Sequence, residues 1–283
     1  MAIELNRIHQ VRWPSGVRLP IVFTFEHQSG EASPLMPGGR PNYMVGDAMQ
    51  YGARRGIWNI LEMLERYGIK ATFFVCGTTA ERFPEAVRVA QETGHEIAGM
   101  SYSFESVRTA STERERAVVN GTIGALQDLT GVRILGWRCP DYRISPQTLD
   151  ILIESDFLWD SSLLNDDTPY LFEHGGRRLV EIPFTTSTAD KTFVGFPTPQ
   201  RGGPDGLASV WNCEFEVLYQ EGERATRFLI LSLQTWLVGR PAVLRKFKQF
   251  LERVVSNKGL WYSRCCDIAQ CWRDHARIQA NRK

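Results

Sequence analysis

Residues 70–99, KATFFVCGTTAERFPEAVRVAQETGHEIAG, decide the fold of this chain. Residues 70–75 are a short, apolar, β-rich run, which predicts a buried strand. Residues 81–93 carry apolar side chains at helical spacing and are followed by Gly94, so they predict a helix. A helical pattern at residues 51–67 precedes the strand. Helices and strands that alternate in this way predict a parallel sheet.

The same alternation continues along most of the chain. Further strands are expected at residues 20–25, 134–137, 157–160, 179–184, 228–233 and 259–262, and further helices at residues 112–130, 145–154, 213–222 and 241–256. The pattern predicts an α/β protein, a (β/α) barrel of about seven strands. We expect three parts: an N-terminal extension at residues 1–19, one barrel domain at 20–275 and a C-terminal tail at 276–283.

Composition and charge argue against several classes of function. Lys and Arg number 33 against 32 for Asp and Glu, without a long run of one sign, so nucleic acid is not an expected partner. The chain has neither a secretion-signal pattern nor an apolar stretch of about 18 residues, so we expect a cytoplasmic protein without a membrane partner. Six irregularly spaced cysteines argue against a disulfide framework, and most of them are predicted to be small core residues.

Four blocks of sequence, in order, resemble the polysaccharide deacetylase (NodB-type) family. They are residues 24–27 (TFEH), 71–75 (ATFFV) with 94–98 (GHEIA), 136–140 (GWRCP), and 157–163 (FLWDSSL) with 166–170 (DDTPY). The resemblance covers nearly the whole chain and implies an irregular seven-stranded (β/α) barrel. Residues 231–241 (LSLQTWLVGRP) are most similar to the branch that acts on small cyclic amides, the allantoinases and cyclic imide hydrolases. Likeness to that branch implies a homo-oligomer, either a dimer or a tetramer.

The likeness fails at the positions that bind a metal ion in the family. Met100 and Phe104 stand in place of two histidines, and a thioether and a phenyl ring cannot hold a hard divalent ion. In the first motif, the family's base and ligand aspartates correspond to Glu26 and then to His27 or Gln28. We therefore expect neither a metal nor a cofactor.

Three side chains are candidates for catalysis. Glu26 is predicted to be a general base, since a carboxylate in a partly apolar pocket has a raised pKa; the alternative is a structural ion pair with Arg138. His27 is interpreted either as a proton carrier or as a core histidine. Arg138 would hold a substrate carboxylate or an oxyanion, or would orient the base as the resemblance implies.

Eight further side chains are candidates for substrate binding. Glu31 would bind substrate N–H groups or be a solvated loop carboxylate, and Cys139 would be a small buried thiol or a nucleophile activated by Arg138. Gln234, which stands where the family often has a late histidine, would hydrogen-bond the substrate, and Trp236 would pack on its ring. The pocket is expected to be apolar and to suit a small planar substrate. The side chains that would make it apolar are Met100, Phe104, Trp137 and Tyr142.

These observations predict a metal-independent enzyme that acts on a small cyclic or aromatic molecule. The default reaction is hydrolysis of a ring C–N bond, with Glu26 as the acid/base group, alone or together with His27. One alternative is an acid/base lyase, isomerase or C–C-cleaving enzyme, because hydrolysis without a metal loses stabilisation of the reacting carbonyl. The other alternative is a protein that binds a small molecule without turning it over.

Overall fold

A curled nine-stranded sheet organises the part of the chain described by the computed structural model, residues 11–33, 42–195 and 202–280. The strand order is β6-β7-β5-β4-β3-β2-β1-β8, and β9 pairs with β1 beside this path. All pairs are parallel except β6 with β7. The strands are β1 Leu19–His27, β2 Thr72–Val75, β3 Glu96–Gly99, β4 Gly136–Trp137, β5 Trp159–Asp160, β6 Tyr170–His174, β7 Arg177–Glu181, β8 Leu229–Gln234 and β9 Leu260–Ser263.

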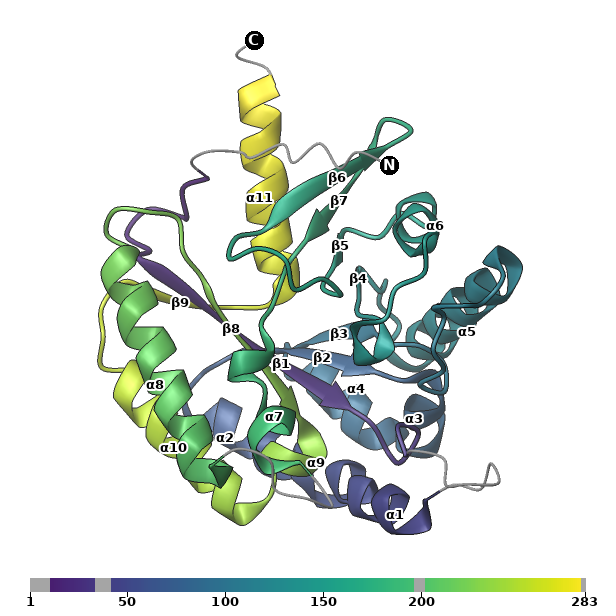
Figure 1. Cartoon of the computed structure of the whole chain (residues 1–283), viewed down its shortest axis with the longest axis horizontal. Helices are drawn as coiled ribbons and strands as arrows, with labels where there is room; N and C mark the ends of the chain where they lie inside the picture. The colour runs from purple at the N-terminus through teal and green to yellow at the C-terminus, as the bar shows by residue number, and fades with distance from the viewer. Residues whose placement is uncertain (1–10, 34–41, 196–201, 281–283) are drawn as a thin grey trace.

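Most of the helices cover the outer face of this sheet, whereas the C-terminal helix packs on its interior face (Figure 1). The helices are α1 Tyr43–Tyr51, α2 Ile57–Arg66, α3 Gly77–Arg82, α4 Pro84–Glu92, α5 Thr112–Thr130, α6 Thr148–Glu154, α7 Asp190–Val194, α8 Gly203–Glu221, α9 Thr235–Val238, α10 Pro241–Val254 and α11 Cys265–Ala280. A π-helical turn, η1 Gly52–Gly56, joins α1 to α2, and two 3₁₀ turns are η2 Pro140–Tyr142 and η3 Thr186–Thr188.

Alternating residues of each strand face the helices and the interior of the curled sheet. In β1, Phe23 and Phe25 pack with the outer core beneath the helices, whereas Val22 packs with the interior cluster. Because side chains alternate along a strand, Glu26 lies on the interior face with Val22. The same alternation in β8 and β3 brings Gln234 and Met100 to the interior. The carboxyl end of β1 therefore carries polar groups above an apolar interior.

The sheet is a half-barrel rather than a closed barrel, because no strand pairing joins β8 to β6 among the described residues. Loops and side chains cover the open edge. Thr188 donates a hydrogen bond to the carbonyl of Ile230 (3.0 Å), and the ring of Trp13 lies 5.7 Å from that of Trp272. Trp13 belongs to the predicted N-terminal extension, of which residues 1–10 lie outside the described residues.

The predicted α/β class and barrel type are confirmed, with corrections at several elements. The β6–β7 hairpin is antiparallel, and residues 170–174 were not predicted as a strand. Its turn uses Gly175 and Gly176 at φ 58° and 76°, which suits a tight hairpin. Helix α8 begins ten residues before the predicted position 213, since glycines weaken the helical signal at its start. Helix α11 crosses the predicted boundary between residues 275 and 276.

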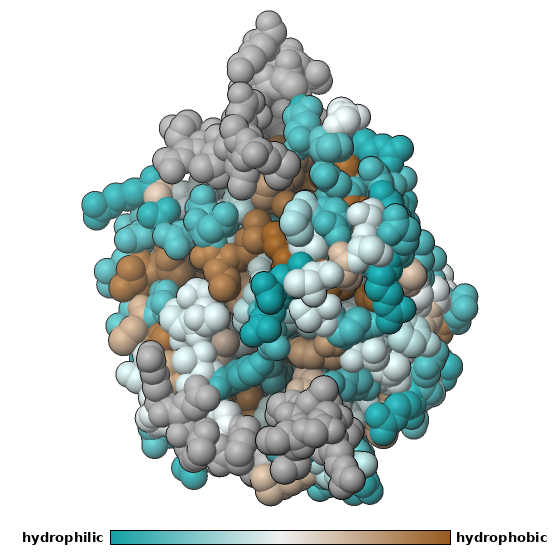
Figure 2. Space-filling view, turned by 45° about the vertical axis from the view of Figure 1, so that its right-hand side comes forward, coloured by the Kyte–Doolittle hydropathy of each residue, from teal (hydrophilic) through white to brown (hydrophobic). Residues whose placement is uncertain are grey.

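The described surface is mixed in character. Figure 2 shows hydrophilic residues around apolar ones that gather in a band across the upper half of one face. Within the described ranges, no helix is long and apolar enough to span a bilayer.

Candidate active site

Glu26 occupies the carboxyl end of β1, between β2 and β8. Its Oε2 atom accepts hydrogen bonds from the side-chain amides of Gln28 and Gln234, both at 3.2 Å, and its Oε1 atom lies 3.8 Å from Nη1 of Arg138. Burial raises the pKa of Glu26, while the charges of Arg138 and Lys191 oppose this rise. A carboxyl group with a raised pKa at this end of a parallel sheet can accept and return a proton.

Gln234 is oriented by its neighbours. Its Oε1 atom accepts a hydrogen bond from the indole of Trp236 (2.6 Å), so its NH₂ group points toward Glu26. Its backbone N–H donates to the Asp190 carboxylate (2.9 Å). Trp236 is itself buried in a small cluster with Val45 and Met49 of α1. Trp236 therefore positions the amide, and packing of its indole on a substrate ring stays a prediction.

Arg138 is fully buried, and its guanidinium donates hydrogen bonds to other residues of the protein. Nε donates to the carbonyl of Ser161 (3.0 Å), Nη2 to its hydroxyl (2.9 Å), and Nη1 to the hydroxyls of Thr24 (3.3 Å) and Ser232 (3.1 Å). The guanidinium also lies between the rings of Phe74 and Phe184, at 4.0 and 4.4 Å from their centroids. This arrangement supports a positioning role beside Glu26 rather than direct contact with a substrate.

The loops after β3 and β4 bring Met100, Phe104 and Tyr142 to the interior cluster. Phe104 and Tyr142 both adopt a positive φ of 61°, which is uncommon for bulky residues and is often found at functional sites. The ring of Tyr142 lies 4.4 Å from that of Phe184. Burial and the charge of Glu26 raise the pKa of Tyr142, so its hydroxyl remains a hydrogen-bond donor at neutral pH.

His27 lies on the face of β1 opposite to Glu26. It pairs in register with Val75, which packs beneath the helices, and its Nδ1 atom lies 3.2 Å from the hydroxyl of Thr235. Burial lowers the pKa of His27 to about 4, so the imidazole is neutral at pH 7. The geometry supports the core histidine rather than the proton carrier, because successive strand residues face opposite sides.

Glu31 is held by protein donors. Its carboxylate accepts hydrogen bonds from the backbone N–H (2.5 Å) and hydroxyl (2.6 Å) of Ser29 and from the hydroxyls of Thr78 (3.1 Å) and Thr79 (2.8 Å). Burial alone would raise the pKa of Glu31, but these hydrogen bonds outweigh it and lower the pKa. Glu31 thus fixes the loop after β1 to α3, and a role in binding substrate stays a prediction.

Trp137 and Cys139 do not line the interior, which corrects their predicted place in the pocket. Both belong to the outer core, where the Trp137 ring lies 5.9 Å from that of Phe157. Arg138, between them, is the residue that faces inward. Burial and the charge of Asp160 raise the pKa of Cys139, which disfavours a nucleophilic thiolate.

The residues at this end of the sheet do not fit a divalent metal ion. Across the part of the chain that the structure describes, no group of three or more His, Cys, Asp or Glu side chains could hold one. Met100 and Phe104 face the interior at the two family ligand positions, and His27 faces away. The donor set that remains is one carboxylate and two amides around Glu26, which is too weak for such an ion.

The structure adds three side chains that the sequence did not indicate. Lys191 forms an ion pair with Asp141 (2.8 Å), and both influence the pKa of Glu26. Asp190 is buried, its Oδ1 atom lacks a partner in the described structure, and burial raises its pKa to about 8. Lys191 and Asp190 lie in a segment without a recognisable motif, and Asp141 directly follows the 136–140 block without belonging to it.

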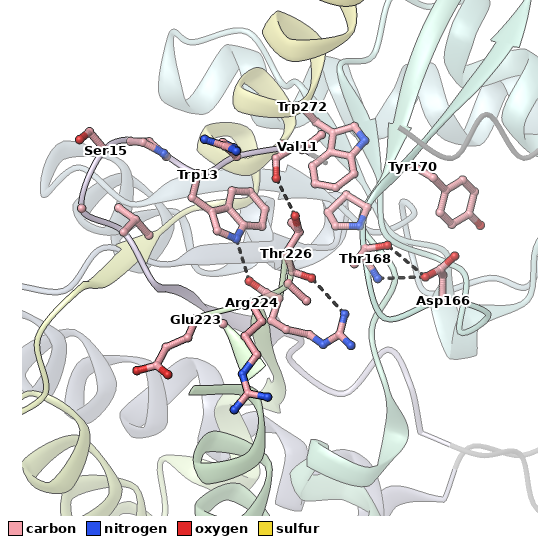
Figure 3. Close-up of a pocket in the computed structure, with 18 residues that line it drawn as sticks. Val11, Trp13, Ser15, Asp166, Thr168, Tyr170, Glu223, Arg224, Thr226 and Trp272 are labelled. Carbon is pink, nitrogen blue, oxygen red and sulfur yellow. Dashed lines mark hydrogen bonds between the residues drawn. The ribbon is translucent and has the colours of Figure 1, made fainter. Parts of the chain in front are cut away.

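A cavity of about 920 Å³ lies elsewhere, beside the segments that precede β1 and β8 (Figure 3). Val11, Trp13, Thr226 and Trp272 are among its lining residues, and none of the predicted site residues lines it. In parallel α/β folds the reacting groups gather at the opposite, carboxyl end of the strands. We therefore place the candidate active site at Glu26.

Comparisons with known proteins agree with this fold and with these motifs. Residues 44–157 match the polysaccharide deacetylase family model. The peptidoglycan deacetylase of Helicobacter pylori is 25% identical, over 76% of this chain and 82% of the relative. A peptidoglycan deacetylase-like protein of Gibberella zeae is 30% identical, over 53% of this chain and 44% of the relative. The crystal structure of Puue allantoinase superposes with a TM-score of 0.84 at 29% identity and covers 94% of each chain.

The fold and the motifs therefore define an α/β half-barrel of the polysaccharide deacetylase class. Residues 44–157 carry the match to the polysaccharide deacetylase domain of the NodB type, and an allantoinase is among the structural neighbours of the chain. The predicted family is thus confirmed.

Proposed function

We propose that this protein is a metal-independent hydrolase that opens a ring C–N bond in a small cyclic amide or imide. Glu26 is the group that accepts and returns the proton. The observation that carries the proposal is a buried carboxyl with a raised pKa at the carboxyl end of β1, beside family ligand positions filled by Met100 and Phe104. The likeness to an allantoinase supports a small cyclic substrate.

The proposed reaction uses one water molecule. Glu26 takes a proton from water as its oxygen bonds to the carbonyl carbon, and a tetrahedral oxyanion forms. Protonated Glu26 then gives the proton to the ring nitrogen as the C–N bond breaks, which leaves a carboxylic acid and an amine or amide in one open chain. The NH₂ group of Gln28 and the hydroxyl of Tyr142 are the donors available near the oxyanion.

The surroundings of Glu26 favour a small and partly apolar substrate. Phe74, Met100 and Phe184 pack in the interior cluster, and Phe104 and Tyr142 pack against it. An apolar interior with a few oriented polar groups is typical of sites for small molecules. A polysaccharide chain would need a longer polar groove.

The test is a screen of hydantoins, dihydropyrimidines, succinimides and allantoin with the protein dialysed against EDTA. Turnover to the ring-opened acid that survives chelation supports the proposal, and the Glu26→Gln protein should lose it. Glu62→Gln, which changes an exposed carboxylate on α2, is the matched control and should keep full activity. Activity that depends on a stoichiometric transition metal would refute the proposal.

Acid/base elimination or isomerisation is the second candidate. It is favoured by the same environment, because one buried carboxyl can move a proton between carbon atoms without activating water. In the same screen, it would give products of unchanged mass or unsaturated products. An unchanged substrate that nevertheless binds would indicate the non-catalytic alternative.

Two further expectations are part of the proposal. We propose a homo-oligomer, a dimer or tetramer, which sedimentation velocity measures directly. We also propose a cytoplasmic location, which fractionation of the source cells tests.

A further inference from the structure

The Lys191–Asp141 ion pair lies at the solvent side of the Glu26 site. The ammonium of Lys191 is 2.8 Å from Oδ1 of Asp141, and the two side chains are 49% and 44% exposed. The Glu26 side chain is 6% exposed. Helix α7, which carries Lys191, contacts β8 and α9 at the carboxyl end of β1 (Figure 1). The ammonium group of Lys191 is therefore accessible to solvent, and its positive charge acts on Glu26.

Arg138, the other cation beside Glu26, is not free to bind a substrate. All three of its nitrogens donate to Ser161, Thr24 or Ser232, and aromatic rings cover both faces of the guanidinium. The anchoring role that the sequence suggested for Arg138 is thus unavailable without breaking this buried network. An anionic group that approaches Glu26 would meet Lys191 instead.

Another anion can replace Asp141 as the ion-pair partner of Lys191. An exposed ion pair contributes little to stability, so its replacement by another anion costs little. The loop that presents Asp141 has positive φ at two successive residues, 49° at Asp141 and 61° at Tyr142. Tyr142 lies against Phe184 in the interior, so the same turn carries an interior side chain and the exposed carboxylate.

We propose that Lys191 determines specificity by binding an anionic group of the substrate, which replaces Asp141 as its partner. The natural substrate would then be a cyclic amide or imide that carries a carboxylate or a comparable negative charge. This inference rests on the proposed function of the Glu26 site and narrows its substrate class.

The test compares two rings that differ in one carboxylate, dihydroorotate and dihydrouracil. Calorimetric titration of the inactive Glu26→Gln protein should show that dihydroorotate binds at least about tenfold more tightly, and Lys191→Met in that background should abolish the preference. Lys191→Arg should keep it. Asp141→Asn should tighten dihydroorotate binding, because the competing carboxylate is gone. In the active protein, Lys191→Met should raise KM for the anionic ring with little change in kcat.

Lys246→Met is the matched control, since Lys246 forms a comparable ion pair with Asp205 between α10 and α8. It should leave the preference intact. Equal binding of the two rings, binding of neither, or a preference that survives Lys191→Met would overturn the inference. If neutral rings are hydrolysed without a preference, only the inference fails. If the Lys191-dependent preference is present and no ring is opened, the inference stands and the proposed hydrolysis fails.

Discussion

Two buried glutamates, Glu26 and Glu96, lie on the interior face of the same sheet but at opposite ends of it. Glu26 ends β1, and Glu96 begins β3. Burial raises the pKa of both carboxyl groups. By burial and proton affinity alone, the two residues would be equally good candidates for an acid/base role.

The hydrogen bonds of Glu26 and Glu96 distinguish the two residues. Glu96 accepts from the hydroxyl of Thr72 (2.8 Å), the indole of Trp159 (3.0 Å) and the backbone N–H of Cys266 (2.9 Å). The last of these bonds caps the first turn of α11. Glu26 has only two longer bonds to amides, at 3.2 Å, and a cation at 3.8 Å.

The difference shows that a raised pKa does not by itself mark a catalytic group. Both oxygens of Glu96 accept short hydrogen bonds that hold strands and a helix together, so its carboxylate has little capacity left for a substrate. Glu26 keeps bonding capacity at the end of the sheet where α/β folds place their chemistry. A carboxyl group that is buried but incompletely bonded is the better candidate.

The largest expected effect is on turnover, and it should distinguish the two residues. Glu26→Gln should lower kcat for ring opening by about 10²- to 10⁴-fold, because an amide cannot take up the proton. Glu96→Gln should change kcat per folded molecule by less than about threefold, since no step uses it. Steady-state kinetics of both variants, normalised to folded protein by circular dichroism, checks this. Equal losses of kcat in the two variants would mean that the catalytic roles of Glu26 and Glu96 do not differ.

The next largest effect is on stability, and here Glu96→Gln rather than Glu26→Gln should cause the loss. Glu96→Gln replaces one acceptor oxygen by an NH₂ group that faces at least one of the three donors, so we expect a loss of about 2–3 kcal/mol and a Tm lower by roughly 5–10 °C. Glu26→Gln should leave Tm unchanged or raise it, because the neutral amide avoids the cost of a buried charge. Thermal unfolding at pH 7.5 measures both, and a large destabilisation by Glu26→Gln would assign it a structural role.

Much of this site could be predicted from sequence because β1 is long and regular. Its nine residues alternate clearly between apolar and polar toward the end, so Glu26 could be placed at a strand end. The same alternation implies that the next residue, His27, faces the other way. A shared proton-transfer role for Glu26 and His27 therefore conflicts with the geometry of a strand, whereas the alternative of a core histidine fits it.

Other parts of the site could not be predicted for physical reasons. Strand β4 has only two residues, so no period shows which of Trp137, Arg138 and Cys139 faces inward. The Lys191–Asp141 contact joins positions 50 residues apart, one in α7 and the other in η2. The saturation of Arg138 depends on hydroxyls from three different strands or strand ends, and a sequence shows none of these distances.

A smaller effect tests the two faces of β1. His27→Asn should lower stability by about 1 kcal/mol, since it removes a buried hydrogen bond to Thr235. It should leave the pH profile of kcat unchanged, because the imidazole, with its pKa lowered to about 4, is already neutral across the working range. A proton-transfer role would instead cost about 100-fold in kcat. Rate measurements between pH 5 and pH 9 distinguish these outcomes.

The smallest expected effect is the pH dependence of the stability that Glu26 contributes. Burial raises the folded pKa of Glu26 above its ordinary value of 4.5, so folding favours the protonated form. Relative to Glu26→Gln, the wild-type protein should therefore be most stable below pH 4.5 and lose that advantage as pH rises through the folded pKa. Burial, and to a smaller extent the charge of Glu26, raises the pKa of Asp190 to about 8 in the wild-type protein, so the two Tm curves are compared well below pH 8. A difference that grows in the opposite direction would mean that Arg138 and Lys191 outweigh burial. Glu26 would then be a stabilising ion-pair partner at neutral pH, as Glu96 is a stabilising hydrogen-bond acceptor, and the contrast between the two glutamates would disappear.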